Sequence, residues 1–366
     1  MQLKLKKGPQ DLEQRVLKQG MCCVCGGCMG LCPYFIEMKE HVVLMEPCGL
    51  TEGRCYDICP RTEVNLEDLN KEVFGHGRDN YVLGSNKSVL MSQSRESSVR
   101  ERGQYGGTVT SLLIHGLESG EIDGALMAGE SKRYGLLPEP VLAKSADDVL
   151  GCTGSKYSAC PSLKLLDKAM RECERLAVVG RPCQVTAIRK RIGIEPEIAD
   201  KISLVIGLFC MWSLDYKKLS EHLKDKLDMS EAKKVDIPYN RFVVHTDSGA
   251  KELDYGPIQE LRNKTCDYCF DFTSEFADVS VGSTEWKEDW NTLIVRTDRG
   301  EKAVESAKSG GKLAVEDMPE DRIELLRKAS LGKKKRVLDA IEGGECPVSD
   351  YLVMDDKENS AIKEGA

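Results

Sequence analysis

Sixteen cysteines dominate the chemistry that this 366-residue chain could perform, and one group of them lies near its start. Four thiols follow the spacing C-x2-C-x2-C-x3-C, with a proline directly after the last: Cys22, Cys25, Cys28 and Cys32. At this spacing, three thiolates hold one iron–sulfur cube and the fourth reaches a neighbouring cluster. The run therefore predicts at least one 4Fe–4S cluster.

A second, less regular run contains Cys48, Cys55 and Cys59, again with a proline after the last cysteine. Together the two runs predict a ferredoxin-like module with two clusters. The first cluster would use the thiols of Cys22, Cys25, Cys28 and Cys59. The second would use those of Cys32, Cys48 and Cys55. Its fourth ligand stays open between Cys23 and an oxygen ligand such as Glu52.

Zinc and disulfides fit the first run less well. Structural zinc sites are built from separated C-x2-C pairs, often with histidine, and no histidine lies between Cys22 and Cys32. Disulfides suit small secreted chains, whereas this chain is long and begins without an apolar signal core. So many cysteines in such a chain predict thiolates kept for metal in a reducing cytoplasm.

A further set of cysteines lies far from the first. Cys266 and Cys269 form another C-x2-C pair, and Cys183 and Cys210 each come directly after a predicted strand. A parallel sheet can bring these four thiols together at one edge, as a third metal site. The alternative is that they are inert, buried cysteines.

Composition narrows the class of protein. The apolar fraction of 41% and charged fraction of 31% are typical of a soluble protein. A net charge of −8 argues against a nucleic-acid partner. The longest uncharged apolar run, residues 203–212, is too short to cross a bilayer and is typical of a buried strand, so we expect at most a peripheral membrane association.

The pattern along the chain predicts four parts: an iron–sulfur module (1–69), a polar linker (70–86), an α/β domain (87–317) and a helical C-terminal extension (318–366). Strands are expected at 88–92, 122–127, 176–179, 202–209, 240–245 and 291–297. Helices are expected at 106–117, 163–173, 182–191, 214–227 and 321–342. Their alternation predicts a mostly parallel sheet covered on both faces. The basic tetrad 333–336 is interpreted as a solvated helix face, and the tail after Val353 as frayed.

Three strand-to-helix turns in the α/β domain could bind a ligand. Glycines let backbone N–H groups approach an anion, helix N-termini favour negative charge, and Thr, Ser and Lys add donors. Together the turns could hold the pyrophosphate and ring edge of a flavin, although each alone is often only a turn. No G-x-G-x-x-G or Walker sequence is present. The candidate residues are Gly106, Gly107, Thr108, Thr110, Ser155, Lys156, Tyr157, Gly180, Pro182 and Gln184.

Five segments in this order resemble one known family: GGTVTSLL, GSKY, GRPCQ, IGLFC and CDYCFDFTSEFADVSVG. They are similar to the beta subunit of coenzyme F420-reducing hydrogenase and its relatives, the F420H2 dehydrogenase input subunit and the F420-linked formate dehydrogenase beta subunit. The resemblance covers residues 87–282, and longer members also carry the N-terminal module. The spacing at Cys48 and the C-terminal extension depart from the family pattern.

The resemblance implies an FAD-containing domain that exchanges hydride with the deazaflavin F420 and passes single electrons to 4Fe–4S clusters. It also implies that Cys183, Cys210, Cys266 and Cys269 ligate a third cluster. Lys156 would place positive charge near a flavin phosphate or the N1 region. No catalytic acid–base pair is expected, because hydride transfer to a flavin depends mainly on alignment.

The expected protein is thus an electron-input subunit that works with redox partner subunits of a larger complex. Such a complex could be of the hydrogenase, formate dehydrogenase, heterodisulfide reductase or F420H2 dehydrogenase type. Two alternatives remain: a flavin oxidoreductase that takes electrons from ferredoxin, and a non-catalytic ferredoxin-type relay whose α/β domain is only a docking scaffold.

Overall fold

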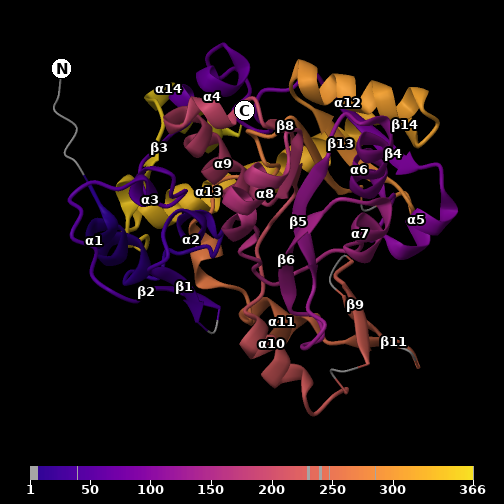
Figure 1. The fold of residues 1–366 in the computed structure, drawn as a ribbon, viewed down its shortest axis with the longest axis horizontal. Helices are drawn as coiled ribbons and strands as arrows, with labels where there is room; N and C mark the ends of the chain where they lie inside the picture. Colours follow the sequence, from indigo (N-terminus) through magenta and orange to yellow (C-terminus); the bar gives the residue numbers. More distant parts are fainter. Residues whose placement is uncertain are drawn as a thin grey trace.

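The structure is a computed structural model that describes residues 7–38, 40–228, 231–238, 241–246, 248–284 and 286–365. At its centre is an eight-stranded sheet with the order β14-β4-β13-β12-β8-β7-β5-β6 (Figure 1). In chain order the strands are β4 (Ser88–Ser94), β5 (Gly124–Glu130), β6 (Pro138–Ala143), β7 (Leu176–Gly180), β8 (Ile202–Leu208), β12 (Val279–Ser283), β13 (Asn291–Val295) and β14 (Leu313–Asp317).

Parallel ladders join β5, β7, β8 and β12, and antiparallel ladders join the other neighbouring strands. Five strands (β4, β5, β7, β8 and β12) therefore run in one direction and three (β6, β13 and β14) in the other. The prediction of a mostly parallel sheet is confirmed, because most of the strands run in the same direction. The antiparallel edges were not predicted, because the repeated strand–helix pattern describes only the central strands.

Helices cover both faces of the sheet, because successive apolar side chains of a strand point to opposite faces and both sets must be buried. Leu176 and Val178 of β7 pack into one core, and Ala177 and Val179 into the other. The first core contains α8 (Leu166–Glu172) and α9 (Pro182–Ile194). The second contains α6 (Thr108–Ser119), α7 (Ala146–Gly151) and α12 (Asp298–Ser309). Shorter helical turns are α5 (Ser97–Arg102) and the 3₁₀ turns Ser162–Leu165, Pro196–Ile198, Lys264–Tyr268 and Ser349–Tyr351.

A smaller unit lies beside the main sheet and has its own apolar core. It consists of the antiparallel strands β9 (Ala232–Asp236), β10 (Phe242–Thr246) and β11 (Gly249–Leu253), with α10 (Tyr216–Leu223) and α11 (Tyr255–Glu260). The strand expected at 240–245 corresponds to β10, and its first residue lies outside the described residues.

The N-terminal part consists of short elements that carry the first two cysteine runs. In order they are α1 (Pro9–Leu12), a π-helical turn (Glu13–Leu17), α2 (Gly27–Leu31), β1 (Phe35–Met38), β2 (His41–Leu44), α3 (Arg54–Asp57), β3 (Val64–Asn65) and α4 (Leu66–Phe74).

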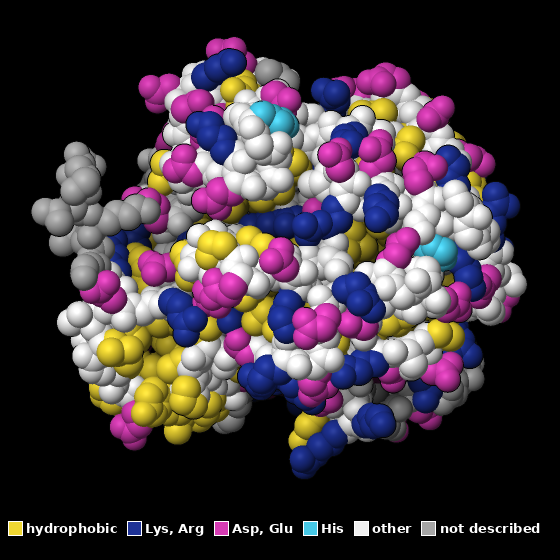
Figure 2. Space-filling view, turned by 45° about the horizontal axis from the view of Figure 1, so that its top comes forward, with side chains coloured by type: hydrophobic (Ala, Val, Ile, Leu, Met, Phe, Trp, Pro, Cys, Tyr) yellow, Lys and Arg dark blue, Asp and Glu magenta, His cyan; other side chains and the backbone are white. Residues whose placement is uncertain are grey.

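Strands β1 and β2 form an antiparallel hairpin between Cys32 and Cys48. Phe35 and Val42 point into the module's core, so alternation turns the neighbouring residues outward. The outward side chains are mostly apolar, and Figure 2 shows hydrophobic side chains gathered at its lower left, over this part of the molecule. We call this surface the hairpin face, defined by Tyr34, Ile36, Met38, Val43 and Met45.

The two ends of the chain pack together. Helix α13 (Glu320–Glu342) is followed by β15 (Leu352–Val353) and α14 (Asp356–Glu364), and β15 pairs in parallel with β3 of the N-terminal module. Cys346, Val348 and Tyr351 belong to the core of that module. The C-terminal extension is therefore part of the module's packing rather than an appendage, and the predicted four-part division does not correspond to four separate cores.

Two parts that the sequence assigned to solvent are buried. Within residues 70–86, expected as a linker, Asn70, Arg78 and Leu83 are buried. In the tail expected to be frayed, Ile362 is buried and Glu358 is 2% exposed. Both predictions were wrong, because partners distant in the sequence supply the contacts that a polar composition alone does not reveal.

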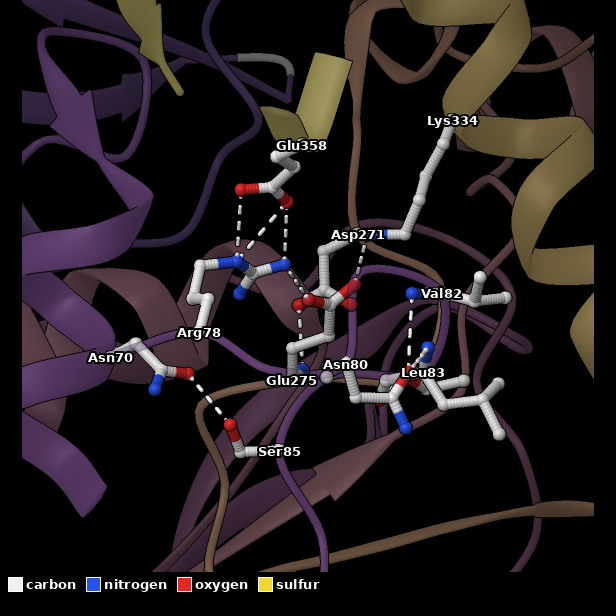
Figure 3. A network of polar contacts seen from close by, with 12 residues as sticks. Asn70, Arg78, Asn80, Val82, Leu83, Ser85, Asp271, Glu275, Lys334 and Glu358 are labelled. Carbon is white, nitrogen blue, oxygen red and sulfur yellow. Dashed lines mark hydrogen bonds and ion pairs between the residues drawn. The ribbon is translucent and has the colours of Figure 1, made fainter. Parts of the chain in front are cut away.

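The basic tetrad is also not a solvated face, since Lys333 and Lys334 are 1% and 0% exposed. A buried network of ion pairs explains why Lys334 can be buried (Figure 3). Lys334 is ion-paired with Glu275, and Arg78 bridges Glu275 and Glu358 at 2.8 Å each. Buried charges are tolerated when they are paired in this way. The network joins the former linker, the segment after Cys269, α13 and α14.

In the part of the chain that the structure describes, no helix is long and apolar enough to cross a membrane.

The buried network predicts a large cost for removing its central cation. Arg78→Met should lower the free energy of unfolding by about 3 to 5 kcal/mol, because it leaves the Glu358 carboxylate buried without its partner. Anaerobic urea unfolding measures this cost. Lys308→Met, which removes an exposed ion pair to Glu305, should leave the unfolding midpoint nearly unchanged. Equal midpoints for the two variants would contradict the role of the network.

Candidate functional site

A cavity of about 800 Å³ lies at the carboxyl ends of the parallel strands. Its wall includes Gly180 at the end of β7, Leu208 at the end of β8 and Ser283 at the end of β12. Ligands of open α/β sheets bind at this edge, since loops there can diverge while the strands stay fixed. The volume lies in the range of ordinary ligand pockets, about 300 to 1,000 Å³.

Most of the predicted cofactor residues meet in this cavity. Gly106 and Pro182 do not line it. A Cβ on Gly106 would come within 2.7 Å of the Ser92 carbonyl oxygen, so this glycine serves close packing on β4, and Pro182 begins α9. The eight that do line it are Gly107, Thr108, Thr110, Ser155, Lys156, Tyr157, Gly180 and Gln184.

The first turn is built to fix the start of α6. Gly107 adopts a left-handed φ of 71°, which glycine accepts at little cost. Thr108 hydrogen-bonds through Oγ1 to Oδ1 of Asn291 at 2.9 Å and to the hydroxyl of Ser92 at 2.8 Å. The N-terminus of α6 is thus held against β4 and β13 at the cavity wall.

The second turn brings a cation into the cavity. Lys156 donates from Nζ to the Thr153 carbonyl at 3.0 Å, and the carboxylate of Glu130 lies 3.9 Å away. Burial lowers the pKa of Lys156, which means that its ammonium is incompletely compensated. An anionic group of a ligand would complete this site. Tyr157 accepts a hydrogen bond from the Ile237 backbone, and burial raises the pKa of Tyr157.

The third turn connects the cavity to the cysteines. Gln184 donates to the Cys160 carbonyl at 2.9 Å and to the Ser162 hydroxyl at 3.0 Å, and its oxygen accepts from the Arg181 backbone. Nη2 of Arg181 and Oγ of Ser158 are buried in the cavity wall and have no hydrogen-bond partner among the described residues. Both atoms can donate a hydrogen bond, so a bound ligand could supply the acceptors that they lack.

Helix α13 forms a wall that sequence reasoning missed. Arg322 and Leu325 line the cavity, and the Arg322 guanidinium lies over the ring of Trp286, 4.9 Å from its centroid. No motif marks these residues. Only the apolar stripe of the long helix indicates that one of its faces must pack against the rest of the chain.

Electrostatic interactions connect the thiols of the first group. Burial raises the pKa of Cys22 to about 12, and the neighbouring thiol of Cys59 adds to the rise. Burial also raises the pKa of Cys28, with further contributions from Cys22 and Cys59. These mutual effects place the thiols of Cys22, Cys28 and Cys59 close together, with Cys25 beside Cys28 and Cys59.

The second group contains Cys32, Cys48 and Cys55. Burial raises the pKa of Cys55 to about 11, and the thiols of Cys32 and Cys48 raise it further. Cys23, one of the two candidates for a fourth ligand, instead interacts with Cys25 and Cys183. Cys23 packs in the core beneath the sheet, and the fourth ligand of the second group stays unassigned.

The inner group consists of four thiols from three segments that are distant in the sequence: Cys183, Cys210, and the pair Cys266 and Cys269. Burial raises the pKa of Cys210 to about 12, with contributions from Cys266 and Cys269. Cys269 differs. Burial raises its pKa, yet the charges of Lys333 and Arg61 outweigh that effect and hold it below the usual value.

Three cations interact with this inner group, the buried Arg61 and Lys333 and the partly buried Arg181. Arg61 donates to the carbonyls of Thr265 and Tyr268 at 2.9 and 2.7 Å. The thiols of Cys183 and Cys210 raise the pKa of Arg181 despite its burial. Lys333 is the third cation. Positive charge at a set of thiols favours their thiolate form, which is the form that binds metal.

The spacing between the thiols of one group decides which kind of metal centre the group could bind. Among the described residues, no three His, Cys, Asp or Glu side chains converge tightly enough to hold a single metal ion. A four-iron cube is larger than one ion, so its thiolate ligands stand further apart. The donor chemistry of the thiol groups, sulfur throughout, fits iron–sulfur clusters better than a lone zinc ion.

The cavity and the thiol groups form a continuous series. Cys210 lines the cavity and belongs to the inner group. Cys183 of the inner group influences Cys22 of the first group, so these two groups are neighbours. Cys55 influences Cys28, which connects the first group to the second. Two thiols of the second group, those of Cys32 and Cys48, flank the hairpin in the chain.

Comparison with known proteins now decides the family. The family of coenzyme F420 hydrogenase/dehydrogenase beta subunits matches residues 89–167 with its N-terminal part and residues 173–321 with its C-terminal part. The chain belongs to this family. The resemblance predicted from the five sequence segments is thereby confirmed. Arg61 and Lys333 both lie outside the matched residues.

Individual members of the family align to different extents. The beta subunit of coenzyme F420 hydrogenase from Methanothermobacter thermautotrophicus is 34% identical, over 70% of this chain and 94% of its own length. One of the subunits of the F420H2 dehydrogenase from Methanosarcina mazei is 28% identical, over 87% of this chain and 91% of its own. The coenzyme F420-dependent sulfite reductase of Methanocaldococcus jannaschii is 29% identical, over 93% of this chain and 54% of its own.

A solved structure agrees with the family fold. A chain of the F420-reducing [NiFe] hydrogenase complex from Methanosarcina barkeri superposes with a TM-score of 0.68 at 28% identity. The superposition covers 72% of this chain and 94% of that one.

The contact between the first thiol group and the cavity wall leads to a prediction at Gly26. This residue has a φ of 90°, and a Cβ there would clash with the Pro161 carbonyl and lie 2.7 Å from the Lys164 nitrogen. Gly20 has a similar φ of 68° but open space around it. Gly20→Ala should cost about 1 to 2 kcal/mol from backbone strain alone. Gly26→Ala should cost about 1 to 3 kcal/mol more from overpacking.

Unfolding free energies of the two variants, measured side by side, isolate the clash from the strain. Equal losses would mean that the first thiol group is not packed against residues 161–164.

Proposed function

We propose that this chain is an F420-linked electron-transfer subunit that works in a larger redox complex. The observation that carries the proposal is the continuous series from a ligand-sized cavity through three thiol groups to an apolar surface. Family membership supports the link to coenzyme F420, since the relatives are named as F420 hydrogenase, F420H2 dehydrogenase and F420-dependent sulfite reductase proteins.

We assign the cavity to FAD. Lys156 and the unsatisfied Nη2 of Arg181 are placed to bind an anionic group such as the pyrophosphate. The backbone at Gly107 and Gly180 allows close approach of the cofactor. FAD, when bound, supplies the conversion between two-electron hydride transfer and single-electron transfer. The chain's own part is to align the ring and to keep water from it.

We assign the thiol groups to 4Fe–4S clusters, which supply one-electron steps. The inner group would take its four thiolates from Cys183, Cys210, Cys266 and Cys269. The first group would use those of Cys22, Cys25, Cys28 and Cys59. The second has three thiolates, Cys32, Cys48 and Cys55, with its remaining ligand unassigned. The direction of electron flow follows from the potentials of the donor and acceptor.

We place the partner subunit on the hairpin face, which defines where electrons leave or enter. Its occupant would be a redox protein, because Cys32 and Cys48 of the second thiol group flank the hairpin in the chain. Met38 and Met45, at opposite ends of the hairpin, are 48% and 53% exposed, and Tyr34 beside Met45 is also exposed. A metal centre close to an apolar surface lets a docked protein exchange electrons over a short distance.

The cluster assignment predicts the result of one cysteine substitution. Cys266→Ala should remove about four irons, one cube, and slow electron exit. It should leave anaerobic bleaching of the flavin by reduced F420 largely intact, because hydride transfer takes place at the cavity. Iron analysis and stopped-flow absorbance measure the two effects. Cys173→Ala, at a buried thiol outside the three groups, is the matched control and should keep all its iron.

The same measurements separate the alternatives. Purified protein without any flavin absorbance would leave only the non-catalytic relay. Flavin that is bleached by reduced ferredoxin but not by reduced F420 would favour the ferredoxin-dependent oxidoreductase. Unchanged iron in Cys266→Ala would remove the inner cluster from the proposal.

The docking assignment predicts that charge on the hairpin face blocks a protein acceptor but not a small one. The double variant Met38→Glu, Met45→Glu should slow reduction of a two-cluster ferredoxin, used as probe, by about tenfold or more, equivalent to about 1.4 kcal/mol. Reduction of methyl viologen should be unchanged. Ile194→Glu, at an apolar residue that is 41% exposed elsewhere, serves as control. Similar rates for both variants would exclude this face.

A further inference from the structure

Lys333 is a buried cation whose role the fold alone does not explain. Its side chain is 1% exposed, and buried lysines normally have a carboxylate partner. Lys333 instead donates from Nζ to two backbone carbonyls, those of Cys210 at 2.5 Å and Asp271 at 2.7 Å. Among the described residues it forms no ion pair, so its positive charge is not cancelled by direct contact with a carboxylate.

The two carbonyls belong to segments that supply thiols of the inner group. Cys210 is itself one of the four, and Asp271 lies two residues after Cys269. One ammonium therefore connects the chain that follows β8 to the chain that follows the Cys266–Cys269 pair. One segment follows β8 and the other leads into the neighbouring strand β12, and their relative placement decides whether the thiols can bind one cluster.

The neighbouring Lys334 fixes the position of this ammonium. Lys334 is ion-paired with Glu275, and its Nζ lies 4.0 Å from the centroid of the Phe270 ring. Glu275 is also bound by Arg78, which in turn binds Glu358 of α14, as Figure 3 shows. A helix anchored in this way cannot slide or turn without breaking buried ion pairs. The position of Lys333 beside the inner group is thus set by the network.

We propose that Lys333 is a positioning residue of the inner group, where it holds the Cys210 and Cys269 segments together and supplies a fixed positive charge that raises the reduction potential of the cluster bound there. This inference rests on the proposed function, because it assumes a cluster at the inner thiols. A cluster with four thiolates is negative and gains another negative charge on reduction, so a nearby cation stabilises the reduced form.

The step concerned is a single-electron transfer, in which reduced flavin supplies the electron and the cluster accepts it without making or breaking a bond. Lys333 lies on a helix that continues beyond the family match, which ends at residue 321. The potential of the inner cluster is therefore set partly by a segment outside the family core.

The test is a redox titration of the whole protein, followed by electron paramagnetic resonance. Lys333→Met keeps the length of the side chain and removes the charge. The reduction equilibrium of the inner cluster should shift towards the oxidised form by about tenfold, which for a one-electron couple is about 59 mV. The clusters of the N-terminal module should keep their potentials, so they provide an internal reference. Lys328→Met, at an exposed residue of the same helix, should change nothing.

An inner cluster that keeps both its iron and its potential in Lys333→Met would overturn the inference and leave the proposed function intact. A wild-type protein with no iron beyond the N-terminal clusters would overturn both. If Lys333→Met loses the inner cluster, Lys333→Arg decides. Return of the iron and of a near wild-type potential supports the role of the charge, and failure to restore them counts against it.

Discussion

Buried ion pairs between segments distant in the sequence determine how this molecule is assembled. Arg78, Glu275, Lys334 and Glu358 come from four segments, and none of them could be buried alone without a cost of several kcal/mol. They are buried because each finds its partner in another segment. The ion pairs therefore do more than stabilise the fold, since they specify which segments lie side by side.

This constraint reaches the candidate site through α13. One part of the helix lines the cavity with Arg322 and Leu325, and another part carries Lys333 to the inner thiols. The network on Lys334 connects the two by fixing the helix along its axis. A single long element thus contributes both to the wall of the cavity and to the charge around the adjacent inner thiols.

Much of this arrangement was predictable from local patterns. The alternation of strands and helices predicts the α/β class, because apolar periodicity is a local property of the sequence. The spacing of Cys22, Cys25 and Cys28 predicts that their thiols lie near one another, because they share one loop. The inner group was only suggested by Cys183 and Cys210 following predicted strands. The predictions that failed concern residues whose partners are distant in the sequence. From the sequence alone, Lys333 and Lys334 are expected to be exposed and Arg78 is expected to lie in a linker. The environment of Cys23 depends on the direction of its side chain, which the sequence does not specify.

The pairing of β3 with β15 has a consequence for how the protein is made. Val64 emerges from the ribosome long before Leu352, yet the two form one ladder. Val348 and Tyr351 also pack in the core of the N-terminal module. Residues 348–353 must therefore be synthesised before the core around the early thiols can close.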